Sequence, residues 1–313
     1  MEKKFVSLVV YLNNCENSIE PFMDAVVPII QENFEHYEII CVDDACIDNS
    51  VEALHEYVKG HELKEMVSVI HMGFFQGLEA AMNAGRDASI GDFVYEFDDM
   101  IVDYEPELIF DLYEKLLTGF DIVSASSDTK MSYSSKLFYK TFNQSRRGAV
   151  GIGPETFRIV SRRAINRIKS LGSYIPYRKA VYANCGLNMT TVSYESKTDE
   201  RRNHNKKHGF STERQGLALD SFIYFTNLME RVSLILSAAF LVFFIFLMVY
   251  TIVDYIVEAG IASGWASMML IMALGFFGVF ALLTIVLKYL SVLLNLIFRK
   301  QKYLVADIEK ITT

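Results

Sequence analysis

A short strand that ends in two acids constrains the fold of this chain more than any other feature. Residues 38–42 are rich in β-branched side chains, and Asp43 and Asp44 follow them directly. After a polar turn, residues 51–58 carry apolar side chains at helical spacing, so a strand leads into a helix. Both acids then lie at the carboxyl end of a strand, where ligands bind in open α/β sheets. Buried acids need donors, a cation or a ligand, although a solvated turn beside a helix cap is the alternative.

Strands alternate with helices along the first 125 residues. Strands are predicted at residues 5–12, 38–42, 66–71, 93–97 and 121–125, and helices at 19–33, 51–58, 76–88 and 106–117. This alternation implies right-handed crossovers and a mostly parallel sheet, so the predicted fold class is α/β. The strand at 93–97 also ends in acids, namely Asp98, Asp99 and then Asp103. Two acidic strand ends in one sheet predict a single acidic crevice.

The middle of the chain, residues 126–178, is polar and basic and includes Lys130 and Arg158. The sequence pattern predicts a strand at 157–160, a helix at 162–171, a final strand region at 181–194 and a charged loop at 195–212. Basic side chains beside an acidic crevice suit an enzyme that handles phosphates. The alternative is a solvated surface that lies near anionic lipid headgroups.

Two long runs toward the C-terminus, residues 232–253 and 266–287, contain no charged side chain. Each is long enough to span a bilayer as a helix, and the link between them is acidic whereas the outer flanks are basic. We therefore expect a two-span transmembrane hairpin in the inner membrane, with the preceding domain and the C-terminus in the cytoplasm. The expected division is an α/β domain at 1–215, an interfacial amphipathic helix at 216–231, two transmembrane helices at 232–298 and a cytoplasmic tail at 299–313.

Composition narrows the classes of partner. The formal net charge is -8 at pH 7 and no long basic stripe is present, so nucleic acid is not an expected partner. The four cysteines show no CxxC spacing, which argues against thiolate metal sites and disulfide frameworks and favours reduced thiols. The first apolar run is too short for a signal peptide, so no secretion signal is expected. Small residues in the apolar runs leave room for a homo-oligomer.

Several segments occur in an order that is typical of one enzyme family. Residues 42–50 read Val-Asp-Asp-Ala-Cys-Ile-Asp-Asn-Ser and resemble the Val-Asp-Asp-Gly-Ser-Xaa-Asp turn of family 2 glycosyltransferases. The other matching segments are Asn14 and Glu16 after the first strand, Gly91-Asp92 before the strand at 93–97, Pro106-Glu107, and residues 135–139 and 157–162. Together with the hairpin, they make the chain look like the polyprenyl-phosphate sugar transferases related to dolichol-phosphate mannose synthase.

The resemblance implies a GT-A fold, a Rossmann-like domain that binds a nucleotide sugar linked to UDP or GDP. The residues it assigns to the nucleotide are Asn14, Glu16, Asp43, Asp44 and Asp48. An Asp-X-Asp motif in this family holds Mg²⁺ or Mn²⁺ against the diphosphate. Here the motif is altered and reads Asp98-Asp99-Met100 or Asp99-Met100-Ile101, so the candidate metal ligands are Asp98, Asp99 and Asp103. The candidate catalytic residues are Asp99 and Asp103, with Arg158 and Lys130 as ligands of an acceptor phosphate.

Two functions are compatible with these residues. The first is a family 2 hexosyltransferase that moves a sugar from a nucleotide sugar to undecaprenyl or another polyprenyl phosphate at the cytoplasmic membrane face. Its product would serve cell-surface polysaccharide biosynthesis or glycan modification. The second is a catalytically impaired transferase-like membrane subunit that acts as a binding or scaffold partner, because function depends on the site rather than on the fold.

Overall fold

A computed structural model of the 313-residue chain describes most of the α/β part. The described residues are 1–128, 153–171, 177–197, 264–298 and 303–312, with isolated helical positions between 136 and 144 and between 235 and 253. The chain divides into two compact units, of which the first is Met1–Ala218 with Arg299–Thr313 and the second is Leu219–Phe298. Lys130, the interfacial helix expected at 216–231 and most of the loop expected at 195–212 lie outside the described residues.

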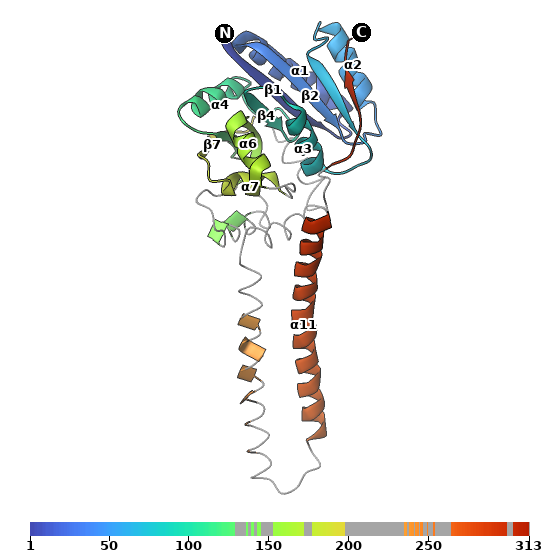
Figure 1. Ribbon diagram of the computed structural model, residues 1–313, viewed down its shortest axis with the longest axis vertical. Helices are drawn as coiled ribbons and strands as arrows, with labels where there is room; N and C mark the ends of the chain where they lie inside the picture. The colour runs from blue at the N-terminus through green and yellow to red at the C-terminus, as the bar shows by residue number, and fades with distance from the viewer. Residues whose placement is uncertain are drawn as a thin grey trace. The chain divides into compact units, whose positions relative to one another are not determined.

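An eight-stranded mixed sheet forms the centre of the first unit, in the order β7-β5-β6-β4-β1-β2-β3-β8 (Figure 1). The strands are β1 (Glu2–Leu12), β2 (Phe34–Asp43), β3 (Val67–Met72), β4 (Phe93–Phe97), β5 (Ile122–Ser127), β6 (Glu155–Ser161), β7 (Met189–Tyr194) and β8 (Val305–Lys310). Strands β4, β1, β2 and β3 are parallel neighbours, as are β5 and β7. Strand β6 runs antiparallel between β4 and β5, and β8 runs antiparallel to β3. The predicted α/β class is therefore confirmed.

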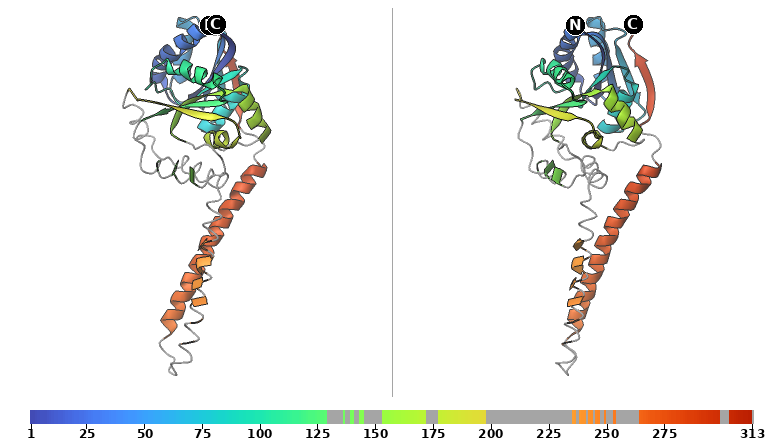
Figure 2. Two further views of the ribbon diagram at one scale, coloured as in Figure 1. Left: turned by 90° about the vertical axis from the view of Figure 1, so that its left-hand side faces the viewer. Right: turned by 60° about the vertical axis from the view of Figure 1, so that its left-hand side comes forward.

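Helices cover both faces of the sheet, as Figure 2 shows. The helices of the first unit are α1 (Ile19–Asn33), α2 (Ser50–Gly60), α3 (Leu78–Ala88), α4 (Leu108–Leu117), α6 (Arg162–Leu171) and α7 (Arg178–Asn184). Helices α1, α2 and α4 share one hydrophobic core with alternate β1 residues such as Leu8 and Val10. Helix α3 packs on the opposite face, where a Cβ on Gly85 would lie 2.3 Å from Cγ1 of Val9. Because both faces are covered, residues 8–12 of β1 form an unbroken apolar run instead of an alternating one.

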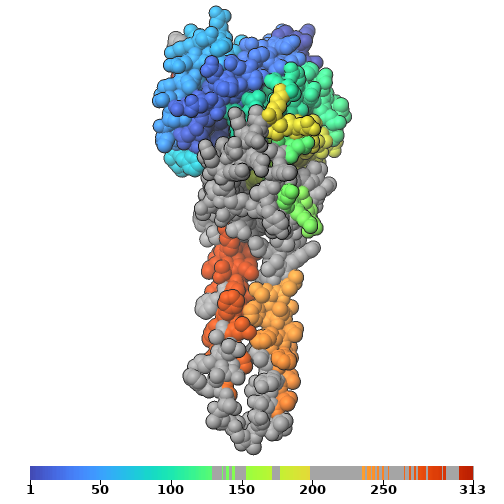
Figure 3. Space-filling model, turned by 180° about the vertical axis from the view of Figure 1, so that it is seen from behind, coloured from blue at the N-terminus to red at the C-terminus, as the bar shows by residue number. Residues whose placement is uncertain are grey.

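At two places in the first unit the structure has another kind of element than the one expected. The strand region expected at 181–194 begins with α7, and only Met189–Tyr194 forms a strand. Residues 299–313, expected as a tail, contain β8, which pairs with β3 at the edge of the sheet. Most β8 side chains are exposed, so the strand lacks the buried alternation by which strands are usually found in a sequence. Seen from behind, the surface of residues 1–128 adjoins that of β7, which pairs with β5 (Figure 3).

The described part of the second unit is dominated by α11 (Trp265–Phe298), which has 34 residues. Within the part of the chain that the structure describes, no helix meets the length and apolarity needed to cross a membrane. All four cysteines are free.

Candidate functional site

The carboxylate of Asp44, directly after β2, is fixed by the loop that precedes α3. Oδ1 accepts a hydrogen bond from the Gln76 amide at 2.8 Å, and Oδ2 accepts one from the Gly77 amide at 2.8 Å. The Tyr11 hydroxyl donates a third, at 3.0 Å. Gly77 has a φ of 86°, a conformation that favours glycine, so this loop geometry depends on the residue type. Burial raises the pKa of Asp44, and the three hydrogen bonds offset part of that effect.

Asp43, the last residue of β2, contacts the neighbouring strand. Its Oδ1 accepts a hydrogen bond from the Cys46 amide at 2.8 Å, which closes the turn. Its Oδ2 lies 2.9 Å from Nδ1 of His71 on β3. Since β2 and β3 are parallel and Asp43 pairs in register with His71, the contact follows directly from the strand alignment. The acid is buried yet satisfied within the protein.

The three other residues assigned to the nucleotide join two loops. The Asn14 side chain accepts a hydrogen bond from the Ile47 amide at 2.9 Å, and the Glu16 carboxylate accepts one from the Asn49 amide at 3.2 Å. The Asp48 carboxylate accepts hydrogen bonds from the Glu16 amide at 3.2 Å and from the amide and the hydroxyl of Ser50. Desolvation is the largest influence on the pKa of Asp48, but these hydrogen bonds outweigh it and lower the pKa. The structure therefore brings all five residues to one edge of the sheet.

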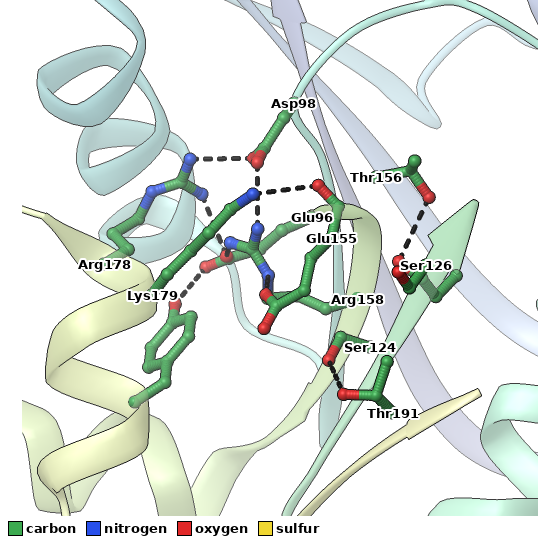
Figure 4. A network of polar contacts seen from close by, with 12 residues as sticks. Glu96, Asp98, Ser124, Ser126, Glu155, Thr156, Arg158, Arg178, Lys179 and Thr191 are labelled. Atoms are coloured by element: carbon green, nitrogen blue, oxygen red, sulfur yellow. Dashed lines mark hydrogen bonds and ion pairs between the residues drawn. The ribbon is translucent and has the colours of Figure 1, made fainter. Parts of the chain in front are cut away.

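A buried cluster of acids and arginines lies at the end of β4 (Figure 4). Glu96 on β4 pairs in register with Arg158 on β6, and its Oε2 accepts hydrogen bonds from Arg158 and Arg178 at 2.9 Å each. Asp98 accepts from the same two guanidinium groups at 2.8 Å each. The Tyr182 hydroxyl donates to the second oxygen of Glu96 at 2.6 Å. Both arginine side chains are fully buried, so the four charges neutralise one another inside the protein.

Further ionic side chains extend the cluster. Glu79 on α3 accepts two hydrogen bonds from Arg178, through its amide and its Nε, at 2.9 Å each. Glu155 lies 3.3 Å from Nε of Arg158, and Lys179 donates to the Glu155 carbonyl at 2.8 Å. Burial alone would raise the pKa of the Glu96 and Asp98 carboxyl groups, but the arginines hold both pKa values below the ordinary range. The cluster fastens α3, α7, β4 and β6 to one another.

Sequence reasoning identified Arg158 and Asp98 but missed Glu96, Glu79 and Arg178. An acid inside the apolar strand at 93–97 was the available signal for Glu96, because a central strand rarely buries a charge without a partner. Nothing local marks Arg178 as its partner, since the two residues are 82 positions apart.

The predicted metal ligands are not assembled in this structure. Both oxygens of Asp98 accept from arginines, and those of Asp103 accept from Tyr194 and Ser196 at 2.9 Å each. Asp99 accepts a hydrogen bond from a nearby amide at 3.1 Å. Among the described residues, no group of three or more His, Cys, Asp or Glu side chains is arranged to hold a metal ion. The donor set present here therefore does not fit Mg²⁺ or Mn²⁺.

Of the two predicted acceptor-phosphate ligands, the structure describes only Arg158. Arg158 is fully buried and its guanidinium faces Glu96, Asp98 and Glu155. Lys130 lies outside the described residues. In the described part of the chain, Arg158 holds the sheet end together and exposes no surface to which a phosphate could bind.

The chain is similar in sequence to known glycosyltransferases. Residues 7–169 match the family described as Glycosyl transferase family 2. The uncharacterized glycosyltransferase sll0501 of Synechocystis sp. is 28% identical over 198 residues, which cover 61% of this chain and 60% of the relative. The undecaprenyl-phosphate 4-deoxy-4-formamido-L-arabinose transferase of Aeromonas hydrophila is 27% identical over 150 residues, which cover 48% of this chain and 45% of the relative. The matches thus span about three fifths and less than half of these two relatives.

A solved structure supports the fold. Glucosyl-3-phosphoglycerate synthase from Mycobacterium tuberculosis, in complex with Mn²⁺, UDP and glucosyl-3-phosphoglycerate, superposes with a TM-score of 0.53 at 16% identity. The alignment covers 70% of this chain and 79% of that one. At this identity the likeness concerns the GT-A-like α/β fold alone.

Proposed function

Because the chain belongs to glycosyl transferase family 2, we propose that it transfers a sugar from a UDP- or GDP-linked donor to a polyprenyl phosphate. The observation that carries this proposal is the edge at the end of β2, where Asp43 and Asp44 are buried and held by fixed donors. Nucleotides bind in open α/β sheets at such strand ends. The hydrogen bond from the Ile47 amide to the Asn14 side chain holds the loop after β1 against the turn after β2 at the same edge.

The acceptor is proposed from the names of relatives. The Aeromonas hydrophila relative is an undecaprenyl-phosphate sugar transferase. An acceptor phosphate is already an anion and needs little help from a general base, so positioning and electrostatic complementarity can supply most of the rate. Dependence on Mg²⁺ or Mn²⁺ stays a prediction, and no step is assigned to a metal because the donor set at Asp98 does not fit one.

We further propose that the chain works at the cytoplasmic face of the inner membrane, to which the runs at 232–253 and 266–287 attach it. The support is the apolar surface of α11, on which Met272, Phe276 and Phe277 are each at least half exposed. Apolar surface of this extent needs a lipid or protein environment. In a bacterial cell fractionation, we expect the chain in the membrane pellet after an alkaline carbonate wash. Release into the supernatant would contradict the attachment.

The test of activity uses the detergent-purified full chain with labelled UDP- and GDP-sugars, undecaprenyl phosphate and Mg²⁺ or Mn²⁺. We expect label in the extracted lipid, and a parallel reaction with EDTA reports whether a divalent metal is needed. Asp44→Asn should reduce transfer by roughly 10- to 100-fold, because one carboxylate oxygen is replaced by an amide that cannot accept from the loop amides. Asp24→Asn is the matched control, since Asp24 lies on α1 and accepts from Tyr57. Equal rates in both variants would remove Asp44 from the site.

A second function is favoured by the arrangement of Asp98 and Asp103. Their oxygens are all engaged by side chains of the protein, which suits a transferase-like subunit that binds a nucleotide sugar without turnover. Calorimetry with UDP, GDP and their sugars separates the two. Binding at micromolar concentration with no lipid product from any donor would favour the subunit, whereas labelled lipid would exclude it.

A further inference from the structure

We propose that the C-terminal strand β8 is a positioning element of the nucleotide site, although it supplies no ligand to it. The proposal rests on the proposed function for the identity of the ligand. Strand β8 begins at Val305, seven residues after α11 ends at Phe298. It belongs to the first compact unit and completes the edge of the sheet beside β3.

The first connection runs through Gln76. Its side chain bonds both backbone groups of Leu304, since Nε2 donates to the carbonyl at 2.7 Å and Oε1 accepts from the amide at 2.8 Å. The Gly73 amide donates to the same carbonyl at 3.0 Å. The backbone amide of Gln76 in turn donates to Oδ1 of Asp44 at 2.8 Å. One residue thus ties the residue before β8 to the buried acid, and it holds the loop that supplies two of the three donors to Asp44.

The second connection runs through His71. Its Nδ1 lies 2.9 Å from Oδ2 of Asp43, and its Nε2 lies 3.5 Å from Oε2 of Glu309 on β8. The same Glu309 oxygen lies 3.3 Å from Nε2 of His55 on α2. Asp43 is therefore linked to β8 through the His71 side chain, and Asp44 is linked through Gln76 to Leu304, the residue before β8. Ion pairs at the protein surface add little to stability, so the contacts of Glu309 are better explained by orientation of His71 than by folding energy.

Loss of these contacts should weaken nucleotide binding more than it weakens the fold. Gln76→Ala removes two hydrogen bonds to Leu304 and lets the loop amides move relative to Asp44. With UDP and GDP as probes, we expect the Kd of the full chain to rise roughly five- to thirty-fold. In the transfer assay, KM for the nucleotide sugar should rise while kcat changes little, because the lost contacts position the bound donor in the ground state as well as in the transition state. The urea midpoint should stay close to that of the wild-type chain.

Gln31→Ala is the matched control for this variant. Gln31 is also a glutamine whose Nε2 makes a hydrogen bond, at 3.0 Å to Tyr37, but it is exposed and lies on α1. A second pair is Glu309→Gln with Asp307→Asn as its control, since Asp307 accepts from the neighbouring Ile308 amide on the same strand. We expect weaker nucleotide binding for Glu309→Gln only. If Gln76→Ala and Glu309→Gln bind nucleotide as tightly as their controls do, the proposal is wrong.

Hydrogen exchange of the unliganded chain separates this inference from the proposed function. In Gln76→Ala, the amides of residues 73–77 should exchange faster than in the wild-type chain, whether or not any nucleotide binds. Unchanged exchange there would overturn the positioning role of β8. If the wild-type chain binds neither UDP nor GDP, the proposed function fails, and the exchange result alone then decides whether β8 fixes the loop.

Discussion

At the scale of single residues, the site is dominated by charges that are buried in matched sets. Arg158 and Arg178 are shared between Glu96 and Asp98, so each carboxylate has two guanidinium partners. Charges in a protein interior are tolerated only when they are paired and hydrogen-bonded. Substitution of one charged residue in this cluster should therefore destabilise the fold, whether or not that residue contacts a ligand.

Replacing Arg178 by Met should lower the free energy of unfolding by about 3 to 5 kcal/mol, because it leaves Glu79, Glu96 and Asp98 short of a partner in the interior. Urea unfolding followed by circular dichroism measures the change. Lys4→Ala is the control, since Lys4 forms an exposed ion pair with Asp92 at 4.0 Å and such pairs contribute at most about 1 kcal/mol. A loss for Arg178→Met no larger than for this control would show that the cluster is dispensable.

Acid should weaken the fold through the same cluster. The pKa values of Glu96 and Asp98 are lower in the folded chain than in the unfolded one, because the arginines outweigh the effect of burial. Their stabilising contribution is then present above the ordinary carboxyl pKa of about 4 and is lost as pH falls toward the lowered values. Asp44 acts in the opposite direction. Burial raises its pKa, so its contribution to stability decreases as pH rises.

The measurement is urea unfolding of wild-type chain and Asp98→Asn between pH 3 and 7. The difference between their free energies of unfolding should be largest at pH 7 and should narrow below pH values of about 4. Asp307→Asn, on the exposed edge strand, serves as the reference variant. A difference that stays constant over the whole range would mean that Asp98 does not titrate with a lowered pKa.

At the scale of elements, the fold depends on how closely α3 approaches the sheet. A Cβ on Gly85 would lie 2.3 Å from Val9 and 2.7 Å from Val42, so this helix packs with no room for a side chain. A Cβ on Gly60, the last residue of α2, would meet no atom within 4 Å. The two glycines therefore offer a matched comparison of close packing and open space.

Gly85→Ala should lower the free energy of unfolding by about 1 to 3 kcal/mol, because the added methyl group must displace two valines of adjacent strands. Gly60→Ala should leave stability unchanged or raise it by up to about 1 kcal/mol, since alanine restricts the unfolded chain more than glycine does. Thermal unfolding of the two variants side by side tests both. Equal midpoints would show that α3 can shift away from the sheet at little cost.

Most elements of the first unit follow from the sequence because their apolar periodicity is strong. The helices predicted at 19–33 and 162–171 and the strand at 93–97 have the same bounds in the structure. The position of Asp43 and Asp44 at a strand end follows from the sequence for the same reason. Periodicity could not find β8 or the pairing of Arg178 with Glu96, because an exposed edge strand lacks a buried face and an ion pair between distant residues leaves no local pattern.

At the scale of the whole molecule, the first unit is built from both ends of the described chain. Ile311, just after β8, is 2% exposed and belongs to the same hydrophobic core as α1 and β1. Its amide donates to the Val67 carbonyl at 3.1 Å. The sheet and its core are therefore complete only when the segment beyond α11 pairs with β3.

Ile311→Ala should lower the free energy of unfolding by about 2 to 5 kcal/mol, as expected for a large buried aliphatic side chain. Ile308→Ala is the control, since Ile308 on the same segment is 59% exposed and its loss should change stability by no more than about 0.5 kcal/mol. Chemical unfolding in detergent measures both. If the two variants unfold at the same urea concentration, the terminal segment does not contribute to the core.

The late position of β8 also has a consequence for biosynthesis. Strand β3 leaves the ribosome at Met72, but its neighbour starts at Val305, about 230 residues later. At a translation rate of about 5 to 20 residues per second, the β3 edge stays open for roughly 10 to 50 seconds. An uncovered strand edge is a template for pairing with other chains. On a polysome, where several nascent copies lie close together, this interval is when the protein is most exposed to misassembly and most in need of a chaperone.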